Sequence, residues 1–215
     1  MGRHEEVPAE MTPPLPRAMF LDIGGVLLDF DHAIAWRRLS VIARVEVEEV
    51  REFLIETGLA RKFDLGEVYA AEFFAMTRRR FALSLEEDAF ARLWADIFTP
   101  KEEVLRLLPA LASALPLYIL SNTDPIHFGH IERTYGLSRH FRDRVLSYEV
   151  GARKPDEGIY RAALALADRP PEESLFFDDI EANVAAARRL GIRAHLFTGV
   201  EGMKRVLGES GILRL

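Results

Sequence analysis

The residues of this chain best suited to chemistry are carboxylates that follow short apolar segments. Asp22 follows the apolar run 18–21 and comes just before the glycine pair Gly24 and Gly25. A buried strand that ends in a glycine-rich turn brings a carboxylate to a place where the backbone can approach a ligand closely. The acidic pair Asp178–Asp179 ends another apolar run. Together with the residues below, these acids describe a site for an anion and a divalent metal.

Two further polar residues accompany the carboxylates. Ser121 ends a second apolar run, and Lys154 lies in a predicted loop. Lys154 is one of four lysines among 28 basic residues, so a chain that otherwise uses arginine keeps a compact point charge here. Such a charge suits a phosphoryl oxygen. Alone, Ser121 reads as a helix cap and Lys154 as a solvated side chain, so their assignment depends on their order with the acids.

The elements that must position these residues are predicted from short apolar segments bounded by turn residues. Strands are predicted over residues 18–22, 117–120, 174–177 and 194–197, with a fifth candidate over 144–147. Helical patterns separate them, so the chain is predicted to be an α/β protein with a Rossmann-like parallel sheet and helices on both faces. Open parallel sheets bind ligands at the carboxyl ends of their strands, so the polar residues should meet there.

Helices of the core are predicted from apolar spacing and from capping residues. They cover residues 102–111, 157–167 and 180–190, together with a helix that starts at Pro125. Asp156 is the expected N-cap of the second, and Thr123 or Asp124 is the expected N-cap of the last.

The interval 31–100 reads differently, as four helices with no strand. A crossover between adjacent strands usually needs one helix, so this long helical insertion predicts a separate lid after the first strand. The predicted organisation is a disordered tail over 1–17, an α/β core from 18–30 and 101–215, and a helical cap over 31–100. The run Arg78–Arg80 is interpreted as a solvated helix end.

Composition narrows the classes to which the protein can belong. The formal net charge is −6 with both signs interspersed, which argues against a nucleic-acid partner. No apolar stretch reaches membrane-spanning length and no polybasic anchor is present, so no membrane association is expected. The absence of cysteine excludes disulfides and thiolate metal sites. The tail lacks the apolar centre of a signal peptide, so the expected location is cytoplasmic. The oligomeric state is not indicated, and Met11 or Met19 could be the start.

Four signatures, taken in order, resemble those of the haloacid dehalogenase superfamily of phosphohydrolases. They are 20–27 (FLDIGGVL), 119–123 (ILSNT), 151–156 (GARKPD) and 176–183 (FFDDIEAN), and the resemblance extends from Phe20 to about Phe197. The run 63–68 (FDLGEV) is similar to the branch with sugar-1-phosphate phosphatases and the N-terminal phosphatase domain of soluble epoxide hydrolases. The resemblance implies an Mg²⁺-dependent phosphatase acting on a small phosphorylated metabolite, with a sugar phosphate as one candidate.

The same resemblance implies roles for individual residues. Asp22 is expected to be the nucleophile and to form an aspartyl-phosphate. Phosphate oxygens are expected to be held by nearby backbone N–H groups at a helix start as well as by side chains. The implied catalytic and substrate-binding residues are Asp22, Ser121, Asn122 and Lys154. The implied ligands of Mg²⁺ are Asp22, the carbonyl of Gly24, Asp178 and Asp179, with Asn183 in support.

The chain departs from the family pattern at one position. Family phosphatases usually carry a second aspartate two residues after the nucleophile, which protonates the leaving oxygen and then activates water; here that residue is Gly24. General acid–base help contributes about 10²–10⁴-fold. Three explanations stay open. The leaving oxygen needs little protonation, as in a sugar 1-phosphate; or catalysis is impaired and the fold binds a ligand or partner; or another group substitutes, among Asp29, Asp31, Asp124 and His127.

Two other enzyme classes of the superfamily are alternatives. A haloacid dehalogenase works without metal and has no need of the pair Asp178–Asp179. A phosphonate hydrolase needs a lid lysine for a Schiff base, and Lys62 is the only lysine in the insertion. Lys62 stands in an Arg-Lys pair that reads as solvated, so a phosphatase is the preferred prediction.

Overall fold

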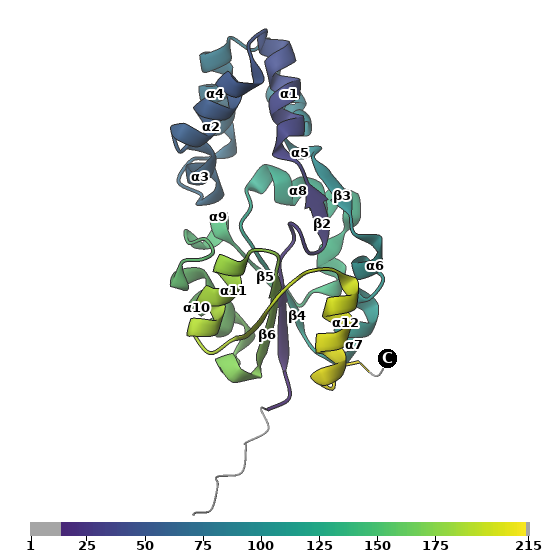
Figure 1. Ribbon diagram of the computed structural model, residues 1–215. Helices are drawn as coiled ribbons and strands as arrows, with labels where there is room; N and C mark the ends of the chain where they lie inside the picture. The colour runs from purple at the N-terminus through teal and green to yellow at the C-terminus, as the bar shows by residue number, and fades with distance from the viewer. Residues whose placement is uncertain (1–13, 214–215) are drawn as a thin grey trace, which may run out of the picture.

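The computed structural model describes residues 14–213 as an α/β core with a group of helices inserted after the first strand (Figure 1). Most of the predicted tail, residues 1–13, lies outside the described residues. Residues 14–17 are bound to the core. The Arg17 N–H donates to the carbonyl of Glu173 over 2.8 Å, and the Arg193 guanidinium donates to the carbonyl of Pro14 over 2.8 Å. The prediction of a disordered tail was therefore wrong for residues 14–17, because these bonds hold them.

Five parallel strands form the central sheet in the order β5–β4–β1–β6–β7. They are β1 (Ala18–Leu21), β4 (Leu117–Ser121), β5 (Asp143–Leu146), β6 (Ser174–Asp178) and β7 (Arg193–Leu196). Strand β1 lies at the centre, where Phe20 pairs with Tyr118 of β4 and with Phe176 of β6. The predicted strands and the Rossmann-like parallel sheet are confirmed, with boundaries shifted by one residue.

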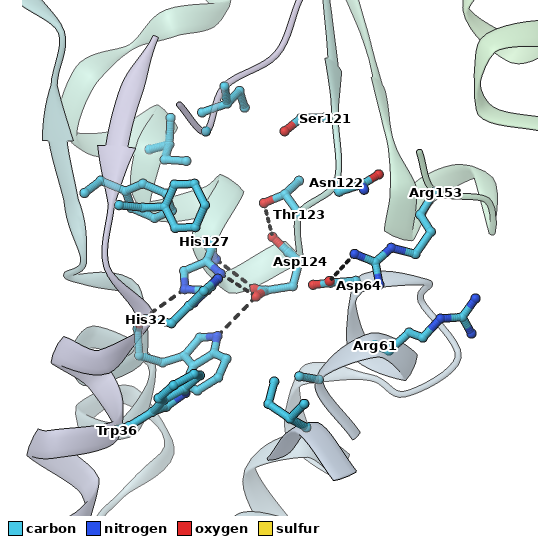
Figure 2. A pocket seen from close by; sticks show the side chains of 18 of the residues that line it. His32, Trp36, Arg61, Asp64, Ser121, Asn122, Thr123, Asp124, His127 and Arg153 are labelled. Atoms are coloured by element: carbon cyan, nitrogen blue, oxygen red, sulfur yellow. Dashed lines mark hydrogen bonds and ion pairs between the residues drawn. The ribbon is translucent and has the colours of Figure 1, made fainter. Parts of the chain in front are cut away.

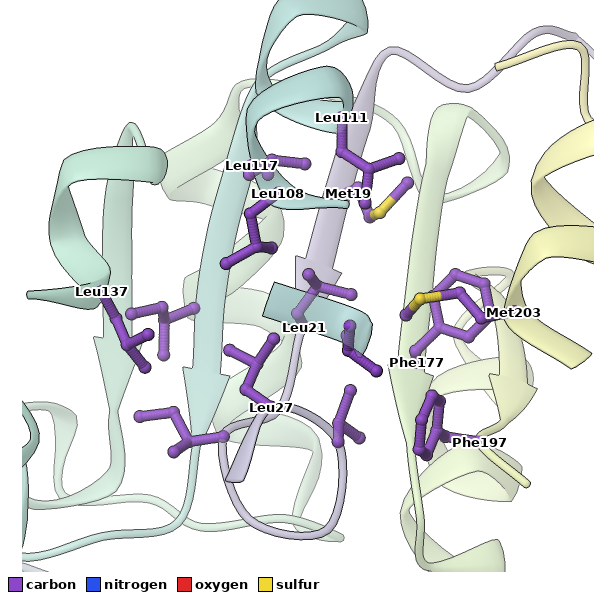
Figure 3. Close-up of a cluster of buried hydrophobic side chains, with 14 of the residues drawn as sticks. Met19, Leu21, Leu27, Leu108, Leu111, Leu117, Leu137, Phe177, Phe197 and Met203 are labelled. Atoms are coloured by element: carbon purple, nitrogen blue, oxygen red, sulfur yellow. The ribbon is translucent and has the colours of Figure 1, made fainter. Parts of the chain in front are cut away.

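Side chains that alternate along the strands explain why helices cover both faces of the sheet. In β1, Met19 and Leu21 belong to one apolar cluster, shown in Figure 3, whereas Ala18 and Phe20 belong to a second. The first cluster packs under α7 (Leu108–Ala114), α8 (Pro125–Tyr135) and α12 (Val200–Glu209). The second packs under α10 (Glu157–Ala167) and α11 (Glu181–Arg189).

The core helices follow the predicted pattern with two differences. Helix α10 has the predicted bounds, but the side chain of Asp156 makes no capping hydrogen bond. The predicted helix over 102–111 is divided into α6 (Glu102–Leu105) and α7, because Pro109 lacks the N–H that a continuous helix requires and stands instead in the first turn of α7. Short helical turns complete the core: η1 (Leu137–His140), α9 (Ser147–Val150) and η2 (Pro171–Glu173).

The inserted segment forms helices with an apolar core of their own, which includes Phe63, Phe73 and Trp94. The helices are α1 (His32–Ala43), α2 (Val47–Glu56), α3 (Leu59–Asp64), α4 (Ala70–Phe81) and α5 (Glu87–Ala95). The prediction of four helices and no strand was wrong on two counts. Helix α3 is a fifth helix that was not predicted, because it is too short to show a helical period. The segment also contains a strand, β3 (Phe98–Pro100), which pairs antiparallel with β2 (Leu28–Phe30). We call α1–α5 the cap; the ribbon β2–β3 joins it to the core (Figure 1).

Two smaller findings concern the surface. Arg78, Arg79 and Arg80 are all exposed at the end of α4, and Arg80 lies 3.6 Å from the carboxylate of Glu49. This agrees with the interpretation of the run as a solvated helix end. Within residues 14–213, no helix combines the length and the apolar character needed to cross a membrane.

Candidate active site

The strand order brings three polar residues to one edge of the sheet. Asp22 follows β1, while Ser121 and Asp178 end its two neighbours, β4 and β6. The Asp22 N–H donates to the carbonyl of Phe177 over 3.1 Å, which holds Asp22 beside the end of β6. Carboxylate oxygens of Asp22, Asp178 and Asp179 lie within 4.8 Å of one another. We call these three residues the acidic cluster.

Lys154 joins two members of the acidic cluster. Its ammonium lies 2.8 Å from Oδ2 of Asp22 and 2.6 Å from Oδ2 of Asp178, and it donates to the carbonyl of Leu120 over 2.9 Å. The residue is only 2% exposed. A buried ammonium is tolerated because each of its three N–H bonds has an acceptor. The structure thus places Lys154 beside Asp22, although 132 residues separate them in the sequence.

Two amide side chains hold this arrangement in place. Asn122 donates from Nδ2 to the Lys154 carbonyl over 2.9 Å and accepts the Lys154 N–H at Oδ1 over 2.8 Å. Asn183 donates to both carboxylate oxygens of Asp178, over 2.9 and 3.1 Å. Because these bonds engage both ends of the Asn122 amide, its geometry supports positioning of the Lys154 loop, and substrate binding by Asn122 stays a prediction.

Burial and crowding set the electrostatics of the acidic cluster. Burial raises the pKa of Asp22 to about 6, against the opposing effect of Lys154 and with a further rise from Asp178. The pKa of Asp179 is also raised, first by burial and then by Asp178. Three carboxylates thus face one ammonium. A divalent cation would relieve their repulsion, and a donor set made only of oxygen suits Mg²⁺.

The glycine turn after Asp22 is shaped by its neighbours. Gly25 has φ +71°, and a Cβ at this position would lie 2.0 Å from Oδ2 of Asp179, so only glycine leaves room for that carboxylate. At Gly24 a Cβ would lie 2.6 Å from Cε1 of Phe30. The ring of Phe30 therefore occupies the space into which the acid–base aspartate of the family pattern would extend.

The four substitute acid–base candidates are engaged in other contacts, so the prediction that one of them replaces the missing aspartate is not supported. Asp29 lies 2.5 Å from the ammonium of Lys101, and Asp31 is the N-cap of α1. Asp124 and His127 bind each other, with Nδ1 of His127 2.5 Å from Oδ2 of Asp124.

Asp124 and His127 connect the core to the cap. The Asp124 carboxylate accepts from the N–H groups of Ile126 and His127 over 2.8 and 2.9 Å, and from Nε1–H of Trp94 over 3.1 Å. Nε2 of His127 lies 3.1 Å from the Trp94 carbonyl. Burial raises the pKa of Asp124, but His127 outweighs burial and the net pKa is lowered. Burial lowers the pKa of His127, but Asp124 outweighs it and the net pKa is raised. The two groups stabilise each other as an ion pair.

Three backbone N–H groups near the start of α8 already have acceptors within the protein, so they are not free to hold phosphate. The N–H groups of Ile126 and His127 donate to the side chain of Asp124. The Thr123 N–H donates to the hydroxyl of Ser147 over 3.0 Å. These three N–H groups are already bound, and phosphate binding by Ser121 and Lys154, which lie beside Asp22, stays a prediction.

A cavity of about 410 Å³ lies between core and cap (Figure 2). Gly24 and Ser121 line it, which places it next to the acidic cluster. One wall is aromatic and includes Phe30, His32, Trp36, Trp94 and Phe98. The opposite wall carries Arg61, Asp64 and Arg153. None of these side chains was predicted to belong to the site; the one signal was the place of Asp64 in the run 63–68.

The chain is similar in sequence to known hydrolases. The family model for haloacid dehalogenase-like hydrolases matches residues 16–191. The D-ribitol-5-phosphate phosphatase of Bacteroides thetaiotaomicron is 23% identical over 177 residues, which cover 79% of this chain and 86% of that protein. The phosphoserine phosphatase of Thermus thermophilus is 33% identical over 147 residues, which cover 67% of this chain and 51% of that protein.

Solved structures share the fold. A haloacid dehalogenase family enzyme from B. thetaiotaomicron, in complex with magnesium and inorganic phosphate, has a TM-score of 0.77 at 25% identity, covering 84% of this chain and 93% of that one. A hydrolase of the same family from Porphyromonas gingivalis has a TM-score of 0.77 at 26% identity, covering 90% and 98%.

Proposed function

Because the chain belongs to the haloacid dehalogenase-like hydrolase family, we propose that it is an Mg²⁺-dependent phosphatase acting on a small phosphorylated metabolite. The observation that carries this proposal is the ammonium of Lys154, 2.8 Å from Asp22 and 2.6 Å from Asp178, beside a cluster of three carboxylates. With Mg²⁺ bound to the carboxylates, such a site would combine two sources of positive charge beside Asp22, so that a phosphate is not repelled. The activities for which the two similar phosphatases are named, and the magnesium–phosphate complex of a similar structure, support it.

The residues present fit magnesium. Asp22, Asp178 and Asp179 offer carboxylate oxygens within 4.8 Å of one another, and the carbonyl of Gly24 is the predicted fourth ligand. When bound, Mg²⁺ supplies positive charge that reduces the repulsion between the phosphate and the acidic cluster.

The proposed reaction has two steps. An oxygen of Asp22 attacks the phosphorus, the bond from phosphorus to the ester oxygen breaks, and an aspartyl-phosphate forms. Water then attacks the phosphorus of this intermediate, which releases the Asp22 carboxylate and inorganic phosphate. Ser121 and Lys154 hold phosphoryl oxygens in both steps. Because residue 24 is glycine, the leaving oxygen takes its proton from solvent, which favours esters whose oxygen leaves readily.

An aryl phosphate tests this proposal, because an aryl oxide leaves without an acid. We expect the purified protein to hydrolyse 4-nitrophenyl phosphate with Mg²⁺, to stop when the metal is chelated, and to lose turnover in Asp22→Asn. Acid-quenched protein should carry phosphate on Asp22. Turnover no higher than that of Asp22→Asn would refute the phosphatase and favour a ligand- or partner-binding protein.

The lining of the cavity argues against one alternative activity, that of a phosphonate hydrolase. A phosphonate hydrolase would need a lid lysine beside the substrate. Lys62 is exposed on α3 and does not line the cavity, so its position favours the phosphatase.

A further inference from the structure

Two carboxylates line the cavity, and they differ in how fully they are bound. Asp124 is occupied by α8 and Trp94, as described above. The side chain of Asp64 accepts no hydrogen bond from any described residue. Its closest basic partner is Arg153, whose Nη2 lies 3.9 Å from Oδ2 of Asp64, too far for a hydrogen bond. Asp64 is therefore an acceptor directed at the cavity without a donor.

Arg153, on the core side of the same wall, is also incompletely bound. Its Nε is the one buried side-chain nitrogen or oxygen in residues 14–213 that lacks a hydrogen-bond partner. A buried donor in this state is costly unless water or a ligand binds it. The backbone next to it cannot relax easily, because Asn122 holds Lys154 through two hydrogen bonds.

A close contact between the cap and the core places Asp64 of the cap next to Arg153 of the core. Gly66, two residues after Asp64, has φ +69°, and a Cβ there would lie 2.3 Å from the carbonyl oxygen of Tyr148. Only glycine permits this approach. As a result α3 lies beside α9 (Figure 1), and Asp64 lies next to Arg153 in one wall of the cavity (Figure 2).

The two walls of the cavity determine which ligand chemistry fits. Asp64 accepts hydrogen bonds and Arg153 donates them, so the pair suits hydroxyl groups, which can both donate and accept. Burial raises the pKa of Asp64 to about 7, with a further rise from Asp124, so near neutrality its carboxyl can donate as well. On the other wall, the rings of His32 and Trp36 stack with centroids 6.1 Å apart and offer apolar surface to C–H groups.

We propose that Asp64 and Arg153 form a subsite for hydroxyl groups of the leaving group, so that the substrates are phosphate esters of polyols or sugars. The inference rests on the proposed phosphatase function, which provides the phosphate end of the ligand. A leaving group without hydroxyls would leave Asp64 and Arg153 without hydrogen-bond partners. The site would reject such an analogue, because polar groups of the site that stay unpaired when a ligand binds cost free energy.

The test compares leaving groups in matched variants. The substrates are ribitol 5-phosphate, glucose 1-phosphate, O-phosphoserine and 4-nitrophenyl phosphate. In Asp64→Ala we expect kcat/KM for the polyol and sugar phosphates to fall about ten- to hundredfold, mainly through KM, with 4-nitrophenyl phosphate nearly unchanged. Glu67→Gln is the control, because Glu67 is exposed in the same loop and does not line the cavity.

A second variant reaches the subsite without altering its side chains. Gly66→Ala must move the loop away from Tyr148 and should cause the same selective loss. Equal losses on aryl and polyol phosphates, or no loss on the polyol and sugar phosphates, would overturn the subsite. A loss confined to O-phosphoserine would also overturn it, since Asp64 would then bind an ammonium group.

The proposed function can fail separately from the subsite. If the wild-type protein does not turn over 4-nitrophenyl phosphate, the phosphatase is refuted, and calorimetric binding of ribitol 5-phosphate decides the subsite alone. Weaker binding to Asp64→Ala than to wild type and Glu67→Gln supports the subsite, and equal binding overturns it.

Discussion

Lys154 is the residue on which the electrostatics of the site depends, because it pairs with two buried carboxylates at once. Neither Asp22, 7% exposed, nor Asp178, fully buried, can be well solvated by water when the ammonium is removed. The same substitution therefore acts on the reaction and on the stability of the fold.

For Lys154→Met we expect turnover of an aryl phosphate to fall by at least about 10²-fold, because a preorganised charge on the phosphoryl oxygens is lost. We also expect the free energy of unfolding to fall by about 3–5 kcal/mol, since two buried carboxylates lose their cation. Mg²⁺ should restore part of this stability. Steady-state kinetics and urea unfolding with and without Mg²⁺ measure both effects. Retained turnover would remove Lys154 from the active site.

The effect of a substitution at Gly24 can also be predicted, because the ring of Phe30 lies close to this position. A Cβ at position 24 would lie 2.6 Å from that ring. We expect Gly24→Asp to lower the free energy of unfolding by about 1–3 kcal/mol. In the double variant Gly24→Asp with Phe30→Ala, the clash is relieved and an acid is present, so kcat for alkyl phosphates should rise over Phe30→Ala by up to about 10²-fold.

Thermal unfolding and kinetics of Gly24→Asp, Phe30→Ala and the double variant separate the two effects. Phe30 is 45% exposed, so its ring has solvent to move into. A single Gly24→Asp variant that melts like the wild type would show that the ring rotates away at little cost.

At the scale of elements, the starts of α1 and α8 meet beside the cavity, where the ring centroids of His32 and His127 are 5.8 Å apart. Burial lowers the pKa of His32 to about 4 from its ordinary 6.5, and His127 adds to this shift, against the opposing effects of Asp124 and Asp31. Between these two pH values the unfolded chain binds a proton at His32 that the folded protein does not. This contribution to stability is present above pH 6.5 and is lost as the pH falls towards 4.

We therefore expect the wild type to lose more stability than His32→Gln when the pH is lowered through this window. Urea unfolding at a series of pH values, with the two proteins compared at each pH, measures the difference. Parallel pH profiles for the two proteins would show that His32 does not titrate differently on folding.

At the scale of the whole molecule, magnesium should act on global stability, because the acidic cluster forms only when the two central strands β1 and β6 are paired. A ligand that binds only the folded state at about 100 times its Kd adds about 2.7 kcal/mol. We expect the Tm to rise with MgCl₂ at constant ionic strength. Asp179→Asn should reduce the rise, because it removes the charge of one proposed ligand at an exposed position. An equal rise in both proteins would mean that Mg²⁺ acts elsewhere.

The parallel sheet, and the edge of it at which the site lies, could be predicted from the order of residues along the chain. Strands can be predicted from local patterns, namely short apolar runs and the turn residues that flank them. The order of acids, serine and lysine along the chain resembles that of a known family. Because parallel strands present their carboxyl ends together, Asp22, Ser121 and Asp178 could be expected to meet. Several elements were not predicted, namely β2, β3, α3, α9, α12 and the turns η1 and η2. Except for α12, each has six residues or fewer and is too short to show a period.

The side chains that surround that edge depend on how the cap packs against the core. The tertiary structure places the ring of Phe30 against Gly24, engages Asp124 with Trp94, which lies 30 residues away, and sets Asp64 next to Arg153. Each of these contacts joins residues from different elements, and the packing of cap on core determines which side chain reaches which. No local pattern of apolar or polar residues carries that information, because the same spacing is compatible with many ways of docking the cap.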